Sequence, residues 1–185
     1  MRVRRYAMYA LLGALALGMG VWTARTRYTP TDVSGMVPAQ LWEMSFPDPA
    51  GKAQFLKQWR GKTLVLNFWA TWCAPCREEI PDLMTIRSEY AAKSVEVVGI
   101  AIDNAQAVVP YSRQMNIAYP VLIGEGEALT VARALGNNSG ALPYTVAIAP
   151  DGTVMMRHLG RLPKAKLQTI LDQSLDSGKT TESHK

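Results

Sequence analysis

Residues 63–81 read TLVLNFWATWCAPCREEIP and contain both cysteines of the 185-residue chain. The first part, 63–69, is a nearly continuous apolar run, which is typical of a central strand covered on both faces. A helix is predicted from about residue 74 to residue 91. Pro75 is compatible with this prediction, since proline is tolerated in a first helical turn. Pro81 then falls in the helix interior, where we expect a kink. The cysteines therefore lie where a buried strand gives way to a helix.

This position suits Cys73 and Cys76 to thiol–disulfide exchange. A helix N-terminus has unpaired N–H groups and a partial positive charge, and both favour thiolate over thiol. Thiolate is the species that attacks a disulfide. Cys76 follows three residues later on the same side of the first turn, so it can resolve a mixed disulfide formed by Cys73. We predict Cys73 as the more exposed nucleophile and Cys76 as the buried resolving cysteine.

The residues between the cysteines, Ala74 and Pro75, bear on the direction of the reaction. No histidine there stabilises the thiolate strongly, and a less stabilised thiolate leaves the disulfide form more favoured. This favours a reductase over a strong oxidant. Three other uses of the pair stay open: a disulfide oxidase or isomerase, a non-enzymatic copper-binding module, and a thiol peroxidase.

The cysteine and histidine content excludes other classes of site. Two cysteines three residues apart cannot connect distant parts of a fold, so a framework of structural disulfides is excluded. A zinc site usually has four ligands, and the only histidines are His158, expected on a surface strand, and His184 in a polar tail. We predict neither a metal nor a cofactor.

The net charge of +5 comes from the N-terminal segment. Residues 1–28 hold five of the 20 basic residues and no acidic one, and the remaining 15 balance the 15 acidic residues. The body of the chain is formally neutral, whereas nucleic-acid binding requires a basic surface on the folded domain. We predict no nucleic-acid partner.

An uncharged stretch of 19 residues, 6–24, follows the first arginines. As a helix at about 1.5 Å per residue it is roughly 28 Å long, close to the hydrocarbon thickness of a bilayer. Arg2, Arg4 and Arg5 favour a cytoplasmic N-terminus. Cleavage after residue 24 would place the bulky Trp22 three residues before the cut, so we favour an uncleaved signal anchor. The protein would then cross the inner membrane once, with its C-terminal domain facing the periplasm or cell exterior. A soluble periplasmic protein after signal cleavage is the alternative.

The predicted organisation is an anchor or signal peptide (1–28), a linker (29–40), one domain (41–176) and a flexible polar tail (177–185). Within the domain, apolar periodicity and turn residues predict strands and helices that alternate, then a hairpin and a closing helix. The predicted strands are 41–46, 63–69, 95–102, 121–123, 144–149 and 153–159. The predicted helices are 55–59, 74–91, 105–115, 128–135 and 163–175. This order implies an α/β fold with a central mixed β-sheet and helices on both faces.

Residues 67–81, NFWATWCAPCREEIP, closely resemble the active-site stretch of the TlpA/ResA/CcmG group of membrane-anchored thioredoxin-like proteins. The shared form is Phe-Trp-Ala-x-Trp-Cys-x-Pro-Cys, followed by a basic residue, a Glu and a Pro. The resemblance extends over roughly residues 41–175. It implies a thioredoxin-like fold with an N-terminal β extension and a central insertion.

The resemblance also implies roles for residues outside the cysteine pair. Pro143 matches the family's cis-proline, which would place the Leu142 backbone beside Cys73, where the family pairs with the substrate backbone. Glu79 matches the acidic residue that lies beneath the cysteines in ResA-like members and is thought to move protons. Thioredoxins proper carry a buried Asp at the position of Asn67, which cannot titrate, so Glu79 would supply any acid–base help.

We expect Trp72 and Pro75 to shape the substrate site together with the proline loop. One departure from the family pattern is Tyr144, where many relatives have Thr. The family implies an exported protein-disulfide reductase, with protein thiols or disulfides as substrates. Apocytochrome c would be one substrate, in cytochrome c-type biogenesis, and a membrane electron donor of the DsbD or CcdA type would reduce the pair again.

Overall fold

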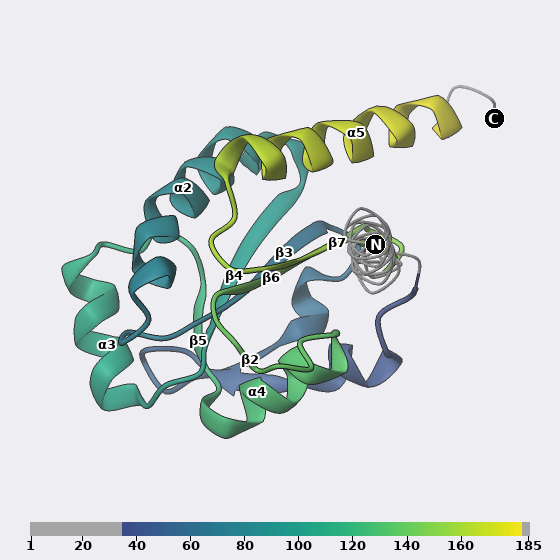
Figure 1. The fold of residues 1–185 in the computed structure, drawn as a ribbon. Coiled ribbons are helices and arrows are strands. Elements are labelled where there is room, and N and C mark those ends of the chain that lie inside the picture. Colours follow the sequence, from purple (N-terminus) through teal and green to yellow (C-terminus); the bar gives the residue numbers. More distant parts are fainter. Residues whose placement is uncertain (1–34, 183–185) are drawn as a thin grey trace, which may run out of the picture. The chain divides into compact units, whose positions relative to one another are not determined.

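The computed structural model describes residues 35–182 of the chain (Figure 1). The predicted anchor, 1–28, and residues 29–34 of the predicted linker lie outside these residues. Within the described range, no helix is both long enough and apolar enough to cross a bilayer. Two residues of the predicted linker pack on the domain: Met36 forms a β-bridge with Thr153, and Val37 is buried.

A five-stranded mixed sheet forms the centre of the domain, in the order β5-β4-β3-β6-β7. Strands β3, β4 and β5 are parallel, whereas β6 runs antiparallel to β3 and forms a hairpin with β7. Their bounds are β3 Thr63–Trp69, β4 Val95–Ala101, β5 Val121–Ile123, β6 Tyr144–Ile148 and β7 Val154–Leu159. Every residue of β3 is buried, as its apolar run predicts. The predicted mixed α/β sheet is confirmed.

Helices cover both faces of the sheet (Figure 1). Helices α2 and α5 pack on one face, and α4 packs on the other beside the N-terminal elements. The bounds are α2 Ala74–Tyr90, α3 Ala105–Gln114, α4 Glu125–Ala134 and α5 Lys164–Glu182. Helix α2 continues through Pro81. Helix α5 continues to residue 182, although we expected a flexible tail from residue 177, because an established helix can propagate into a polar segment.

The N-terminal extension differs in part from its prediction. Residues 41–46 were expected as one strand, but the 3₁₀ helix η1 (Ala39–Glu43) occupies the first half of that range. Strand β1 (Ser45–Pro47) follows and pairs with β2 (Ala53–Phe55), after which comes a second 3₁₀ helix, η2 (Leu56–Trp59). The reason is that the neighbours Leu41 and Trp42 are both buried, which a helical turn permits and strand alternation does not.

The alternation of side chains along β3 divides the core in two. Val65 and Trp69 face the side of α2 and α5, whereas Leu64, Leu66 and Phe68 face the side of α4. Asn67 lies on the α2 side with Val65 and Trp69, so it places a polar amide inside the core next to the cysteines.

Gly99 of β4 is a tight position in this core. It pairs with Asn67 in the sheet, and a Cβ there would lie 2.9 Å from Tyr119 Cε2 and 3.0 Å from Trp69 Nε1. We expect Gly99→Ala to lower the free energy of unfolding by about 1–3 kcal/mol, because overpacking forces neighbouring atoms to shift. Urea denaturation measures the change.

The matched control is Gly126→Ala in α4, where a Cβ has nothing within 4 Å. This change should raise the free energy of unfolding slightly, because glycine weakens a helix. Equal shifts for both variants would contradict the packing argument.

Candidate functional site

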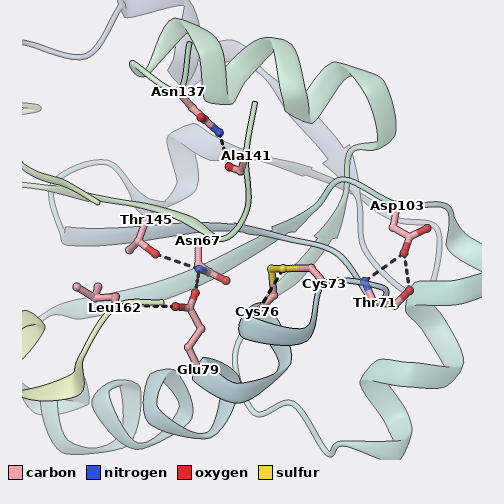
Figure 2. Close-up of a disulfide and its surroundings, with 10 residues drawn as sticks. All are labelled: Asn67, Thr71, Cys73, Cys76, Glu79, Asp103, Asn137, Ala141, Thr145 and Leu162. Carbon is pink, nitrogen blue, oxygen red and sulfur yellow. Dashed lines mark hydrogen bonds between the residues drawn. A yellow bond between two sulfur atoms is a disulfide. The ribbon is translucent and has the colours of Figure 1, made fainter. Parts of the chain in front are cut away.

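The junction between β3 and α2 places the cysteine pair. Cys73 is the N-cap of α2, with extended backbone angles (φ −87°, ψ 104°), and Pro75 lies in the first turn. The Sγ atom of Cys73 accepts a hydrogen bond from the backbone N–H of Cys76 at 3.3 Å. The two cysteines form a disulfide with a Cα–Cα distance of 5.3 Å (Figure 2). The helix N-terminus expected to favour a thiolate is thus directed at Cys73.

The two cysteines differ in exposure in the predicted order. Cys73 keeps 6% of its surface exposed, and Cys76 keeps none. Trp72 precedes Cys73 and is 69% exposed, and Pro75 is exposed as well. A large apolar surface therefore lies beside the more accessible cysteine.

The turn before Cys73 is held by an aspartate that the sequence did not single out. Asp103 follows β4, and its Oδ2 accepts hydrogen bonds from the Thr71 hydroxyl at 2.5 Å and the Thr71 N–H at 3.2 Å (Figure 2). These bonds join the ends of two neighbouring parallel strands. They fix the backbone two residues before Cys73.

Glu79 lies on the buried face of α2, one turn after Cys76 (Figure 2). Its Oε1 accepts a hydrogen bond from Asn67 Nδ2 at 2.5 Å, and its Oε2 accepts one from the Leu162 N–H at 3.0 Å. Asn67 Nδ2 also donates to Thr145 Oγ1 at 3.0 Å. The carboxyl group is therefore bound by elements on both sides: β3 through a side chain and the β7–α5 loop through the backbone.

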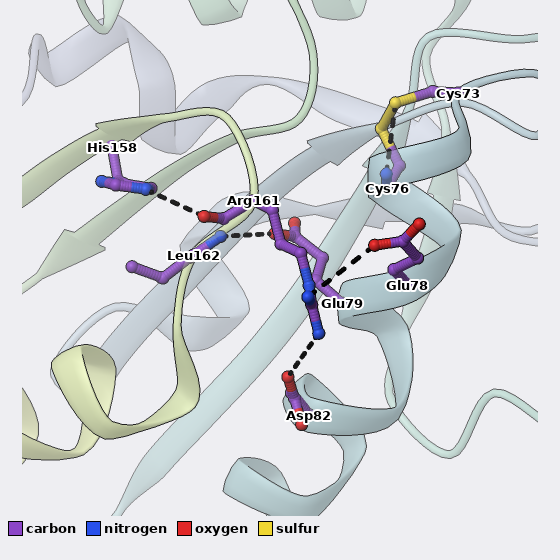
Figure 3. Close-up of polar contacts among 8 residues, drawn as sticks. All are labelled: Cys73, Cys76, Glu78, Glu79, Asp82, His158, Arg161 and Leu162. Atoms are coloured by element: carbon purple, nitrogen blue, oxygen red, sulfur yellow. Dashed lines mark hydrogen bonds and ion pairs between the residues drawn. A yellow bond between two sulfur atoms is a disulfide. The ribbon is translucent and has the colours of Figure 1, made fainter.

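Burial raises the pKa of Glu79 from its ordinary value of 4.5 to about 7. The hydrogen bonds from Leu162 and Asn67 and the charge of Arg161 act in the opposite direction, while Asp82 raises the pKa further. Arg161 lies at the exposed side of α2, with Nη1 3.7 Å from Glu78 Oε2 and Nη2 3.8 Å from Asp82 Oδ2 (Figure 3). Near neutral pH this carboxyl group can both accept and donate a proton.

The proline loop has the expected conformation, since the Leu142–Pro143 peptide bond is cis. Leu142 packs against both parts of the core, and the Pro143 carbonyl accepts the Gly160 N–H at 2.8 Å. The buried Asn137 anchors the preceding loop by donating from Nδ2 to the Ala141 carbonyl at 3.0 Å (Figure 2). The loop is thus fixed at both ends.

Tyr144, the departure from the family pattern, points into the core. It is 3% exposed, and its hydroxyl donates to the Leu135 carbonyl at 2.8 Å. The residue therefore anchors the end of α4 and leaves the exposed surface beside the cysteines to other side chains.

His158 lies on β7, as predicted, and is half-buried. Burial lowers its pKa, and one ring nitrogen lies 3.2 Å from the Arg161 carbonyl oxygen (Figure 3). Across residues 35–182, no group of three or more His, Cys, Asp or Glu side chains is placed to hold a metal ion.

Sequence reasoning missed four parts of this arrangement: Thr145, Asp103, Arg161 and the Leu162 N–H. Thr145 had a signal, since it is the one hydroxyl among apolar residues after Tyr144 in β6. The Leu162 N–H had none, because a backbone donor in a loop leaves no trace in a residue pattern.

The cysteine pair lies at the start of a helix that follows the central strand of a mixed sheet, and a cis-proline directly precedes β6, which pairs with that strand. This combination defines a thioredoxin-fold thiol–disulfide oxidoreductase. The comparisons agree. The AhpC/TSA family profile matches residues 37–157. Thiol-disulfide oxidoreductase ResA of Bacillus cereus is 34% identical over 128 residues, which covers 68% of this chain and 71% of the relative. The chain therefore belongs to the AhpC/TSA family and to the ResA-like thiol–disulfide oxidoreductases.

Solved structures support the same fold. A thioredoxin-family thiol:disulfide interchange protein from Chlorobium tepidum TLS is 29% identical, with a TM-score of 0.66, and covers 76% of this chain and 97% of its own. A secreted thiol-disulfide isomerase from Corynebacterium glutamicum is 20% identical, with a TM-score of 0.67. The match covers 80% of this chain and 96% of the isomerase chain. The resemblance stated from residues 67–81 is confirmed.

The raised pKa of Glu79 predicts a pH-dependent stability. The unfolded carboxyl group ionises near pH 4.5 and the folded one near pH 7. Between these values the folded state binds the extra proton, so stability falls as pH rises. As pH rises through this window, the free energy of unfolding of the wild type should fall by roughly 3 kcal/mol relative to that of Glu79→Gln.

Urea unfolding of the oxidised proteins at a series of pH values measures the difference. Parallel stability curves for the wild type and Glu79→Gln would contradict the raised pKa.

Proposed function

We propose that the chain is a protein-disulfide reductase in which Cys73 attacks the substrate and Cys76 resolves the intermediate. The observation that carries this assignment is the asymmetry of the pair. Cys73 is the accessible N-cap, whereas Cys76 is enclosed one turn from the buried carboxyl group of Glu79. Only Cys73 can reach the disulfide of a protein substrate without unfolding of the site.

The reaction begins with the reduced pair. The Cys73 thiolate attacks one sulfur of the substrate disulfide, forms a mixed disulfide and releases the other substrate sulfur as a thiolate. Cys76, after giving up its proton, attacks Cys73 Sγ and releases the second substrate sulfur. The substrate gains two electrons and two protons, and the protein ends with the Cys73–Cys76 bond.

Glu79 supplies acid–base help in this cycle. Its pKa of about 7 lets it accept the Cys76 proton in the resolving step and return a proton in the reverse direction. Asn67 and the Leu162 N–H hold its two oxygens in place.

The exposed surface around Cys73 receives the substrate. Trp72 and Pro75 provide apolar contact, and the Leu142 backbone, before the cis bond to Pro143, pairs with the substrate chain. Tyr144 takes no part, since it is buried.

The reducing direction rests on Ala74 and Pro75, which leave the thiolate without a neighbouring histidine. An exported reductase must be reduced again after each turnover, because its compartment is oxidising. A membrane donor of the DsbD or CcdA type fits this need, and apocytochrome c is one proposed substrate. Residues 6–24 would anchor the chain with residues 41–176 on the periplasmic side; a cleaved, soluble periplasmic form is the alternative.

Cysteine substitutions test the order of attack. Cys76→Ser should accumulate a mixed disulfide with a peptide disulfide substrate, because nothing resolves it. The matched variant Cys73→Ser should form much less, since the remaining cysteine is enclosed. Mass spectrometry of the full chain after acid quenching counts the adduct. Equal trapping by both variants would overturn the assignment.

A further inference from the structure

In the side-chain amide of Asn67, the nitrogen has hydrogen-bond partners and the oxygen has none within the described residues. The residue is fully buried on β3, and its Nδ2 donates two hydrogen bonds, to Glu79 and to Thr145. Its Oδ1 is buried and has no partner within the described part of the chain. A buried acceptor without a donor is uncommon in native proteins and calls for an explanation.

The free oxygen lies on the side of the cysteine pair. Cys76 and Glu79 are three residues apart on one buried face of α2, and Asn67 packs beneath that face. Because Nδ2 is directed at Glu79, Oδ1 is directed away from it. Figure 2 shows Oδ1 on the disulfide side of the amide and Nδ2 on the Glu79 side.

The oxidised pair cannot satisfy this acceptor, because neither sulfur carries a hydrogen. A dithiol reductant breaks the S–S bond by transferring two electrons and two protons, and is itself oxidised to a disulfide. Cys76 then carries an S–H group, which is a hydrogen-bond donor. Reduction thus creates a donor on the side of the amide toward which Oδ1 is directed.

We propose that Asn67 Oδ1 accepts a hydrogen bond from the Cys76 thiol in the reduced protein, so that one amide connects the resolving cysteine to Glu79. The inference rests on the proposed function in one respect, the role of Cys76 as the resolving cysteine. Asn67 is on this account a positioning residue.

The bond has two consequences for the site. It favours the neutral form of Cys76, so the pair is held with its thiolate at Cys73 and its proton at Cys76. It also removes an unsatisfied acceptor that only the oxidised form contains, so it favours the reduced state. The other charged or titratable groups near Glu79 are Arg161, Asp82 and Tyr119.

Infrared spectroscopy of Cys76 tests the bond directly. In full-length Cys73→Ser, the remaining thiol gives one S–H stretching band, which a hydrogen bond to a carbonyl lowers in frequency. Adding Asn67→Leu should move the band to higher frequency. The matched control Thr145→Val removes the other partner of Nδ2 and should leave the band in place. A band that is the same with and without Asn67→Leu would overturn the proposal.

A second measurement needs no change at Asn67. The ¹³Cγ signal of Asn67 in the wild type should shift on reduction, because its carbonyl gains a donor, and the shift should survive Thr145→Val. An unchanged signal would count against the proposal even if Asn67→Leu failed to fold.

The redox equilibrium separates this inference from the proposed function. Asn67→Leu should move the equilibrium with glutathione about tenfold towards the disulfide, which is about 30 mV for a two-electron couple. An oxidising wild-type potential with a normal S–H response would end the reductase proposal and leave the Asn67 bond standing. A reducing potential with no S–H response would leave the reductase proposal standing and end the proposal for Asn67.

Discussion

The site depends on the way β3 ends at the start of α2. All seven residues of β3 are buried between β4 and β6, so the strand cannot shift without exposing apolar side chains on both faces. The turn after it is tied to Asp103, and Cys73 then caps the helix. A rigid strand therefore places Cys73, the proposed nucleophile, at a helix N-terminus, where partial positive charge and free N–H groups favour a thiolate.

The buried carboxyl group of Glu79 shows how the fold adjusts its acid–base chemistry. Burial alone would hold the group neutral, and two N–H donors with a nearby guanidinium partly restore the charged form. The balance falls near neutral pH, where proton transfer in both directions is easiest. Three separate segments meet at this carboxyl group: α2, β3 and the loop before α5. A change in any of them should alter how easily this carboxyl group ionises.

Much of this arrangement follows from the sequence, because strong local patterns and long-range packing agree in the centre of the domain. The apolar run of β3, the helix after it and the short strand β5 occur where the pattern placed them. The N-terminal extension did not follow its alternation, since Leu41 and Trp42 are both drawn into the core. Glu79 could be named from the family motif, but its donors could not. One donor is the side-chain amide of Asn67, a position singled out in the sequence only because thioredoxins proper carry an Asp there. The other donor is the backbone N–H of Leu162, far along the chain.

The central claim is that the Cys73–Cys76 pair works as a reductant. The most direct test is its equilibrium reduction potential, measured on the full chain against a series of glutathione ratios. We predict a value near that of thioredoxin, about −270 mV. A value near that of a strong disulfide donor, about −120 mV, would contradict the account and recast the protein as an oxidase.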